Sequence, residues 1–221
     1  MMTQFDPPAT RAMRHAMVAS QLRTNAVSDQ RVVAAMASIP RERFLPADAR
    51  AVAYRDTAIP VGRGRAANPP LATARLLTAA ELEASDRVLL VGAGGGYAAA
   101  VLAEVVAHVT ALESDAALLA VAREGLAGAG AVALVEGPLE AGWAAGAPYD
   151  VLVVDGAVEA LPPALVEQVR PGGRVATGLA ERGVTRLAAG RRSAGGFGLT
   201  VFADSECVVL PGFARPTGFR F

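Results

Sequence analysis

The sequence predicts an α/β protein: a doubly wound, mostly parallel sheet with a helical extension at its N-terminus and an antiparallel hairpin at its C-terminus. Between residues 87 and 177, short apolar runs alternate with helix-forming segments, which is the pattern of βαβ units. The run Val88–Val91 is apolar without a break, as in strands that helices cover on both faces. A hydrophobic fraction of 52% in 221 residues is enough for one large buried sheet.

Each expected element follows from local pattern. Apolar spacing and caps predict helices over about 9–23, 29–38 (capped by Ser28), 47–54, 70–82, 97–106, a segment capped by Ser114 or Asp115 that ends near 128, and 162–169. Short apolar runs predict parallel strands over 87–91, 108–112, 132–135, 150–154 and 174–177. The tail predicts two antiparallel strands, 184–189 and 197–202, joined by a turn over 191–196, while residues 57–70 are expected to form a loop.

Charge is balanced over the chain but not along it. Every basic residue is Arg; residues 1–75 hold 11 Arg against 5 acidic residues, and the remainder is acidic by the same margin. One interpretation is a coding bias toward Arg, and the other is that this half attracts carboxylate-bearing substrates, which a guanidinium holds bidentately. A zero net charge argues against a nucleic-acid partner.

Several features favour a soluble protein of the cytoplasm. Cys207 is the only cysteine, so no internal disulfide is expected. The first residues hold no apolar stretch typical of a secretory signal. The longest apolar stretches are interrupted by Gly or charge, so no membrane span is expected.

A glycine loop carries the strongest functional signal. The strand Val88–Val91 runs directly into Gly92-Ala93-Gly94-Gly95-Gly96, and a helix is expected to begin at Tyr97. Glycines let backbone approach a ligand, and the N–H groups at a helix N-terminus bind anionic or polar atoms. Glu113 follows 21 residues after Gly92, at the end of the next strand, where a carboxylate accepts hydrogen bonds from ribose hydroxyls. This constellation predicts nucleoside binding; a tight turn without a ligand is the alternative.

Tyr97 indicates which nucleoside is bound. A dinucleotide fingerprint requires Gly or Ala at that position. The pattern here is instead G-x-G-x-G, which resembles motif I of class I S-adenosylmethionine-dependent methyltransferases.

Further segments resemble protein-L-isoaspartate O-methyltransferases over roughly residues 12–180. The most specific is Ile39-Pro40-Arg41-Glu42-Arg43-Phe44-Leu45-Pro46, which a generic methyltransferase does not require. The other resembling segments are Met17–Arg23, Asp29–Met36, Ala53–Asp56, Gly142–Trp143, Ala147–Asp150, Leu161–Leu165 and Arg170–Arg174.

The resemblance implies one Rossmann-like methyltransferase domain over 1–221. Its parts would be a helical extension with the substrate loop (1–70), a cofactor-binding core (71–180) and the hairpin and tail (181–221). The implied cofactor is S-adenosylmethionine, and no metal is expected. The residues expected to contact the cofactor are Gly92, Ala93, Gly94, Gly96, Glu113, Ser114, Gly137, Pro138, Leu139 and Asp155.

The implied reaction transfers a methyl group to the free α-carboxylate of L-isoaspartyl residues in damaged proteins. That carboxylate is ionised at neutral pH, so the reaction needs alignment more than a general base. Asn68 is expected to orient the carboxylate, helped by Arg63 or Arg65; the alternative for these two arginines is that they lie in water. The partner is then a peptide or protein bearing isoaspartate, and the sequence leaves the oligomeric state open.

Three positions depart from the family pattern. Its loop usually reads G-H-G-Q-T-I-S-Q-P, with a supposed catalytic Ser where Asn68 stands here. Leu90 replaces an acid that helps order the methionine end of the cofactor, and Pro138 replaces an Asp that reaches the adenine amine. These departures leave two alternatives open: a methyltransferase acting on another carboxylate or small molecule, and a non-catalytic binding protein.

Overall fold

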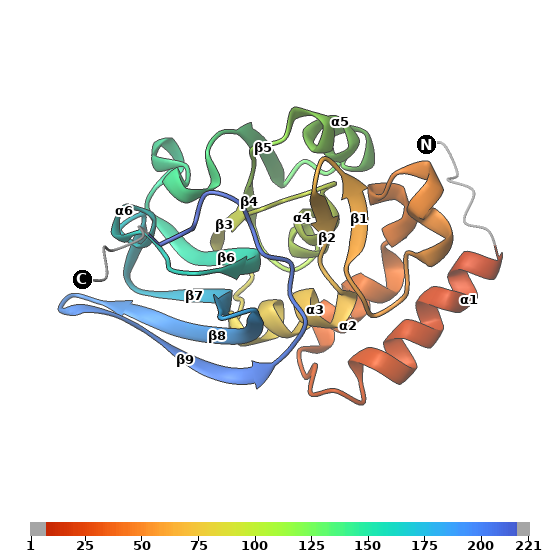
Figure 1. The fold of residues 1–221 in the computed structure, drawn as a ribbon, viewed down its shortest axis with the longest axis horizontal. Coiled ribbons are helices and arrows are strands. Elements are labelled where there is room, and N and C mark those ends of the chain that lie inside the picture. Colours follow the sequence, from red (N-terminus) through yellow and green to blue (C-terminus); the bar gives the residue numbers. More distant parts are fainter. Residues whose placement is uncertain (1–7, 216–221) are drawn as a thin grey trace.

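A computed structural model describes residues 8–215 and shows a central sheet with helices on both faces (Figure 1). The helices are α1 Pro8–Met17, α2 Gln30–Ser38, α3 Pro70–Ala79, α4 Tyr97–Ala103, α5 Ala116–Gly125 and α6 Pro163–Val166. A π-helical turn, Val18–Leu22, extends α1, and short 3₁₀ helices occupy Arg41–Phe44, Ala47–Val52, Leu139–Ala141 and Ala144–Gly146. The N-terminal residues that bear on a secretory signal lie outside the described part of the chain.

The main sheet has the order β5-β4-β3-β6-β7-β8-β9. Its strands are β3 Arg87–Val91, β4 His108–Glu113, β5 Val132–Glu136, β6 Tyr149–Val158, β7 Val169–Glu181, β8 Val184–Ser193 and β9 Gly196–Asp204. The strands from β3 to β7 pair in parallel, and β8 and β9 add an antiparallel hairpin. The predicted doubly wound, mostly parallel sheet with a C-terminal hairpin is therefore confirmed.

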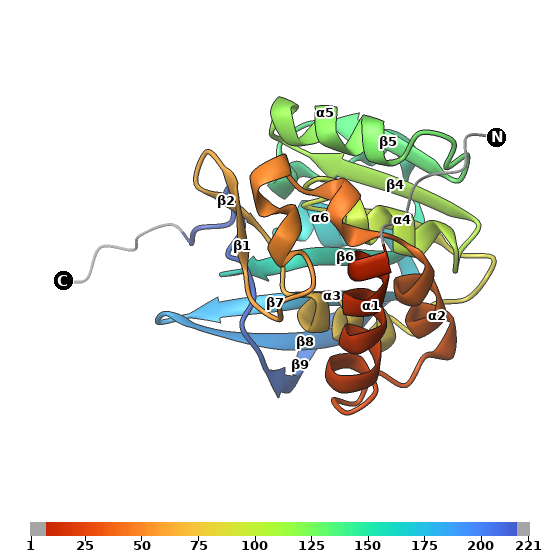
Figure 2. The same ribbon diagram turned by 90° about the vertical axis from the view of Figure 1, so that its right-hand side faces the viewer.

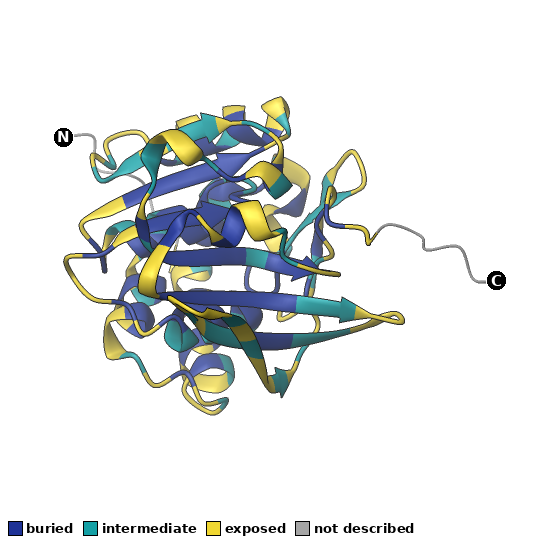
Figure 3. Ribbon diagram, turned by 90° about the vertical axis from the view of Figure 1, so that its left-hand side faces the viewer, coloured by how far each residue is buried: buried dark blue, intermediate teal, exposed yellow. Residues whose placement is uncertain are grey.

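Helices cover the sheet because residues of each central strand alternate between two apolar cores. Val88 and Leu90 belong to one core with α2, α3, α4 and α5, whereas Leu89 and Val91 belong to the other core with Leu165 of α6. The central strands are buried and the edge strand β9 is mostly exposed (Figure 3). The chain leaves β3 toward β4 and β5 and then returns to β6 on the opposite side, which places a crevice at the carboxyl ends of β3 and β6.

Residues 57–70 differ from the predicted loop. They contain a two-stranded antiparallel hairpin, β1 Ile59–Gly62 and β2 Arg65–Ala67, which pairs with itself and lies beside the carboxyl ends of the parallel strands (Figure 2). The strands have four and three residues and one contains Pro60, so the segment carries no alternating pattern that would predict them.

Two further local predictions are wrong. Asp29, not Ser28, caps α2, because its carboxylate accepts the Arg31 backbone N–H at 2.9 Å. The turn between β8 and β9 is only residues 194–195, since pairing continues to Ser193 and Gly196. Asp115 caps α5 as one of the two predicted residues, accepting from the backbone N–H groups of Ala117 and Leu118.

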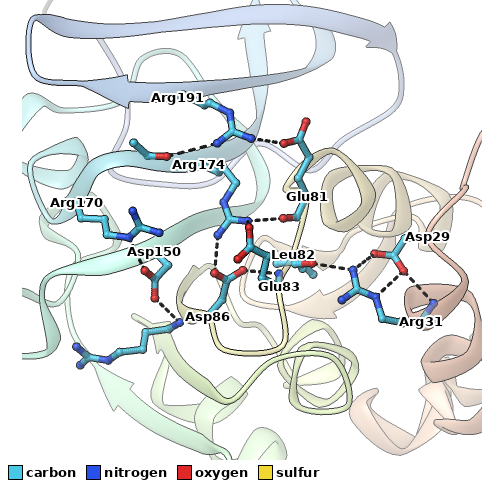
Figure 4. Close-up of polar contacts among 12 residues, drawn as sticks. Asp29, Arg31, Glu81, Leu82, Glu83, Asp86, Asp150, Arg170, Arg174 and Arg191 are labelled. Atoms are coloured by element: carbon cyan, nitrogen blue, oxygen red, sulfur yellow. Dashed lines mark hydrogen bonds and ion pairs between the residues drawn. The ribbon is translucent and has the colours of Figure 1, made fainter.

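Ion pairs lie at the amino ends of the parallel strands, at the opposite end of the sheet from the crevice (Figure 4). Arg174 of β7 pairs with Asp86 at 2.5 Å, and both side chains are almost fully buried. Asp86 also accepts the Glu83 backbone N–H at 2.6 Å, so it fixes the turn that leads into β3. Among the described residues, no helix is long and apolar enough to cross a membrane.

Candidate cofactor and acceptor site

The glycine loop joins β3 to α4 at the crevice. Gly92, Gly94 and Gly96 all have left-handed φ angles, of 79°, 55° and 98°, which residues other than glycine adopt only at an energetic cost. A Cβ on Gly94 would meet no atom within 4 Å, so this side of the loop is open. A Cβ on Gly95 would lie 2.0 Å from the Phe44 carbonyl oxygen, so the Arg41–Phe44 turn packs directly on the loop.

Glu113 ends β4 beside this loop, as predicted, and its side chain is fully buried. Its carboxylate accepts the backbone N–H groups of Gly94 at 2.8 Å, Ser114 at 2.8 Å and Asp115 at 3.0 Å. Arg65 of β2 forms a bidentate ion pair with the same carboxylate, at 2.7 and 3.0 Å. The predicted ribose-binding residue and a predicted acceptor-binding residue are therefore direct partners.

A cavity lies between the glycine loop and the β1–β2 hairpin. Its lining includes the predicted residues Gly92, Ala93, Gly94, Arg65, Asn68 and Asp155. The tail contributes Leu210, which packs on Gly92. The loop after β2 and the carboxyl half of β6 thus bring the predicted acceptor-orienting and cofactor residues to one place.

Asn68 and Asp155 are hydrogen-bonded inside this cavity. The Asn68 amide nitrogen donates to Asp155 Oδ1 at 3.0 Å, and Thr73 Oγ1 donates to the same oxygen at 2.7 Å. Asn68 Oδ1 accepts the Val208 backbone N–H at 3.0 Å, which fixes the orientation of the amide beside the buried Cys207 thiol. Burial raises the pKa of Asp155; the bonds from Asn68 and Thr73 and the charge of Arg41 oppose this shift only in part.

Arg41 and Tyr97 form the floor of the cavity, and sequence reasoning assigned neither a role in binding. The Arg41 guanidinium lies 4.9 Å from the Tyr97 ring centroid and donates to the Asn68 carbonyl at 2.7 Å. Arg41 Nε and the Tyr97 hydroxyl are buried without a hydrogen-bond partner among the described residues. Burial raises the pKa of Tyr97 to about 12, so its hydroxyl is a donor at neutral pH. The sequence signal that could have identified Arg41 as a site residue is its place in the segment that most specifically resembles the family.

The other predicted residues lie around this centre. Ser114 follows Glu113 and, with Arg63, lines a shallow groove beside the hairpin. Gly137 donates its backbone N–H to the Glu113 carbonyl at 3.2 Å, so the segment after β5 adjoins Glu113. Pro138 is exposed and Leu139 is buried in the second core. Leu90, at the position of the missing acid, is fully buried in the first core.

Arg63 lies at the exposed tip of the hairpin, with a left-handed φ of 52°. Its positive charge, like that of Arg65, contributes to lowering the pKa of Asp115, after the larger effect of the backbone N–H bond from Leu118. Within residues 8–215, no group of three or more His, Cys, Asp or Glu side chains is arranged to hold a metal ion.

Comparison with known proteins gives consistent matches. The family model described as protein-L-isoaspartate(D-aspartate) O-methyltransferase matches residues 13–204. Protein-L-isoaspartate O-methyltransferase 1 of Rhodopseudomonas palustris is 42% identical over 172 residues, which are 77% of this chain and 70% of that protein. The protein-L-isoaspartate O-methyltransferase of Koribacter versatilis is 38% identical over 201 residues, 90% of each chain.

Solved structures show the same fold. A protein-L-isoaspartate O-methyltransferase superposes with a TM-score of 0.79 and 23% identity, covering 90% of this chain and 66% of that chain. A β-aspartate methyltransferase from Plasmodium falciparum, solved in complex with S-adenosyl-L-homocysteine, superposes with a TM-score of 0.74 and 17% identity. It covers 89% of this chain and 97% of that one.

Proposed function

Because this chain belongs to the protein-L-isoaspartate O-methyltransferase family, we propose that it transfers a methyl group from S-adenosylmethionine to the free carboxylate of L-isoaspartyl residues in damaged proteins. The observation that carries this proposal is the match of the family model to residues 13–204 of the chain. The relatives named above supply the substrate class, and the cavity supplies groups that suit both substrates.

The residues around the cavity fit the cofactor. The glycine loop is open at Gly94, and Glu113 lies beside the loop at the position where a carboxylate would bind the ribose of the cofactor. The unpartnered Arg41 Nε and Tyr97 hydroxyl are donors that a ligand carboxylate would satisfy. Gly92, Gly94 and Gly96 would hold the cofactor through backbone, with Glu113 on its ribose. When bound, S-adenosylmethionine supplies a methyl group on a sulfonium, which is a good leaving group.

The chain's own contribution is to align the acceptor. The Val208 and Asp155 bonds hold the Asn68 amide in place in the lining of the cavity, where we place the acceptor carboxylate. Arg41 adds a buried positive charge on the same side.

No group in the cavity needs to remove a proton. The acceptor oxygen is already ionised at neutral pH, so no side chain of the cavity has to act as a general base. Positioning in line is the main contribution expected of the protein. We place this reaction in the cytoplasm, where the buried free thiol of Cys207 would stay reduced.

The test is methyl transfer to a pair of matched peptides. One peptide carries isoaspartate and the other carries ordinary aspartate at the same position, each incubated with methyl-labelled S-adenosylmethionine. A base-labile methyl ester is expected on the isoaspartyl peptide alone, and Asn68→Ala should reduce its rate. No ester above background on the isoaspartyl peptide would contradict the proposal, and a panel of small-molecule acids would then identify another acceptor.

A further inference from the structure

The carboxylate of Glu113 has no acceptor site left for a new ligand in the observed arrangement. It accepts five N–H groups: two from Arg65 and one each from the backbone of Gly94, Ser114 and Asp115. A carboxylate offers about four lone-pair sites. Ribose hydroxyls therefore reach this carboxylate only if one of its present donors leaves.

Arg65 is the donor that can leave. The three backbone donors belong to the glycine loop and to the turn that begins α5, so the fold fixes them. Among the described residues, Arg65 is the only side chain other than Ser114 that bonds this carboxylate, and it lies on a hairpin that pairs only with itself. A Cβ on Gly62 or Gly64 would meet no atom within 4 Å, and the hairpin projects from the body of the molecule (Figure 2).

A released Arg65 stays at the acceptor side of the site. It lines the same cavity as Asn68, three residues further along the chain. The Arg65 side chain is only 11% exposed, and its Nε is buried without a partner among the described residues. A carboxylate that enters this cavity would offer Arg65 the bidentate partner that it loses at Glu113.

We propose that Arg65 and the cofactor ribose compete for Glu113, and that ribose binding transfers Arg65 to the carboxylate of the acceptor. Arg65 then contacts the acceptor carboxylate directly and makes the acceptor bind more tightly after the cofactor. This inference rests on the proposed function for its second half only. By thermodynamic linkage, the factor by which cofactor tightens acceptor binding equals the factor by which acceptor tightens cofactor binding.

Calorimetric titration with S-adenosylhomocysteine tests the competition. Arg65→Gln removes the cation but keeps a hydrogen-bonding side chain, and Arg63→Gln makes the same change at the exposed tip of the same hairpin as a control. We expect Arg65→Gln to bind S-adenosylhomocysteine about tenfold more tightly than the parent, and Arg63→Gln to match the parent within about twofold. Binding by Arg65→Gln that equals or is weaker than that of the parent would overturn the competition.

A second variant protects the test against loss of folding. Arg65→Lys keeps the charge but cannot form the bidentate pair, so its affinity for S-adenosylhomocysteine should lie between those of the parent and Arg65→Gln. If Arg65→Gln does not fold, tighter binding by Arg65→Lys supports the competition and equal or weaker binding overturns it.

Peptide binding tests the transfer of Arg65. The affinity of a labelled isoaspartyl peptide is measured by fluorescence anisotropy with and without saturating S-adenosylhomocysteine. The parent should bind the peptide several-fold more tightly with S-adenosylhomocysteine, and Arg65→Gln should lose this gain. An equal gain in both proteins would overturn the transfer. If the parent does not bind the peptide at all, the result counts against the proposed acceptor. The calorimetric titration with S-adenosylhomocysteine still tests the competition for Glu113 in that case.

Discussion

The buried hydroxyl of Tyr97 gives a prediction in which stability and ligand binding change in opposite directions. The hydroxyl is buried without a partner among the described residues, while the ring contacts Arg41 and lies 5.9 Å from the Phe44 ring. Tyr97→Phe removes the hydroxyl and keeps the ring. A buried polar group without a partner costs about 1–3 kcal/mol, so the ligand-free variant should be more stable by up to this amount.

Differential scanning calorimetry measures both effects. For a chain of this size, each kcal/mol corresponds to roughly 2–4 °C in Tm. Without ligand, Tyr97→Phe should therefore melt a few degrees above the parent. With saturating S-adenosylhomocysteine the advantage should shrink or reverse, because the parent then gains a hydrogen bond that the variant cannot form.

Tyr149→Phe is the matched control. The Tyr149 hydroxyl is also buried, but it donates to the Trp143 carbonyl at 2.8 Å. Its removal should lower stability by about 1 kcal/mol, with or without ligand. A lower Tm for ligand-free Tyr97→Phe, like that of Tyr149→Phe, would refute the reasoning, since it would mean that the Tyr97 hydroxyl is already satisfied.

Three other predictions test the site and its support. Asp155→Asn should be more stable than the parent at pH 8 and should lose this advantage toward pH 4. A carboxyl whose pKa is raised by folding destabilises the fold as the pH rises from its ordinary pKa to its raised pKa, by about 1.4 kcal/mol for each pH unit between the two. Thermal melts that show the same difference in stability at both pH values would contradict this. Asp86→Ala should lower the unfolding free energy by about 3–5 kcal/mol in urea denaturation, since Arg174 is left buried, and adding Arg174→Met should recover part of the loss; a double variant as unstable as the single one would argue against it. Gly95→Ala should weaken S-adenosylhomocysteine binding at least about tenfold in calorimetry, because the new Cβ would lie 2.0 Å from the Phe44 carbonyl oxygen; unchanged affinity would show that the loop adapts.

The parallel part of the sheet could be predicted because its signals are local. Val88–Val91 is apolar on both faces, the glycines follow at once, and Tyr97 begins the next helix; neighbours along the chain specify the whole strand-loop-helix unit. The position of Glu113 followed from the same regularity, since parallel strands bring their carboxyl ends to one edge.

The hairpin β1–β2 could not be predicted, because short strands are stabilised by pairing and by what they pack against rather than by their own pattern. Missing this hairpin also made the prediction for Arg65 incomplete. Arg65 was expected to face the acceptor or water, but the hairpin brings it to Glu113, 48 residues away along the chain.

The sequence by itself determined the βαβ order, the glycine loop with Glu113 at its side, and the family resemblance, because each depends on residues that are adjacent or regularly spaced. Only the tertiary structure decided which charged and polar side chains meet. Arg65 with Glu113, Asn68 with Asp155, and Arg41 over Tyr97 are all pairs between separate elements. The energies that select such pairs depend on burial and on a few ångströms of distance, which spacing along a chain does not specify.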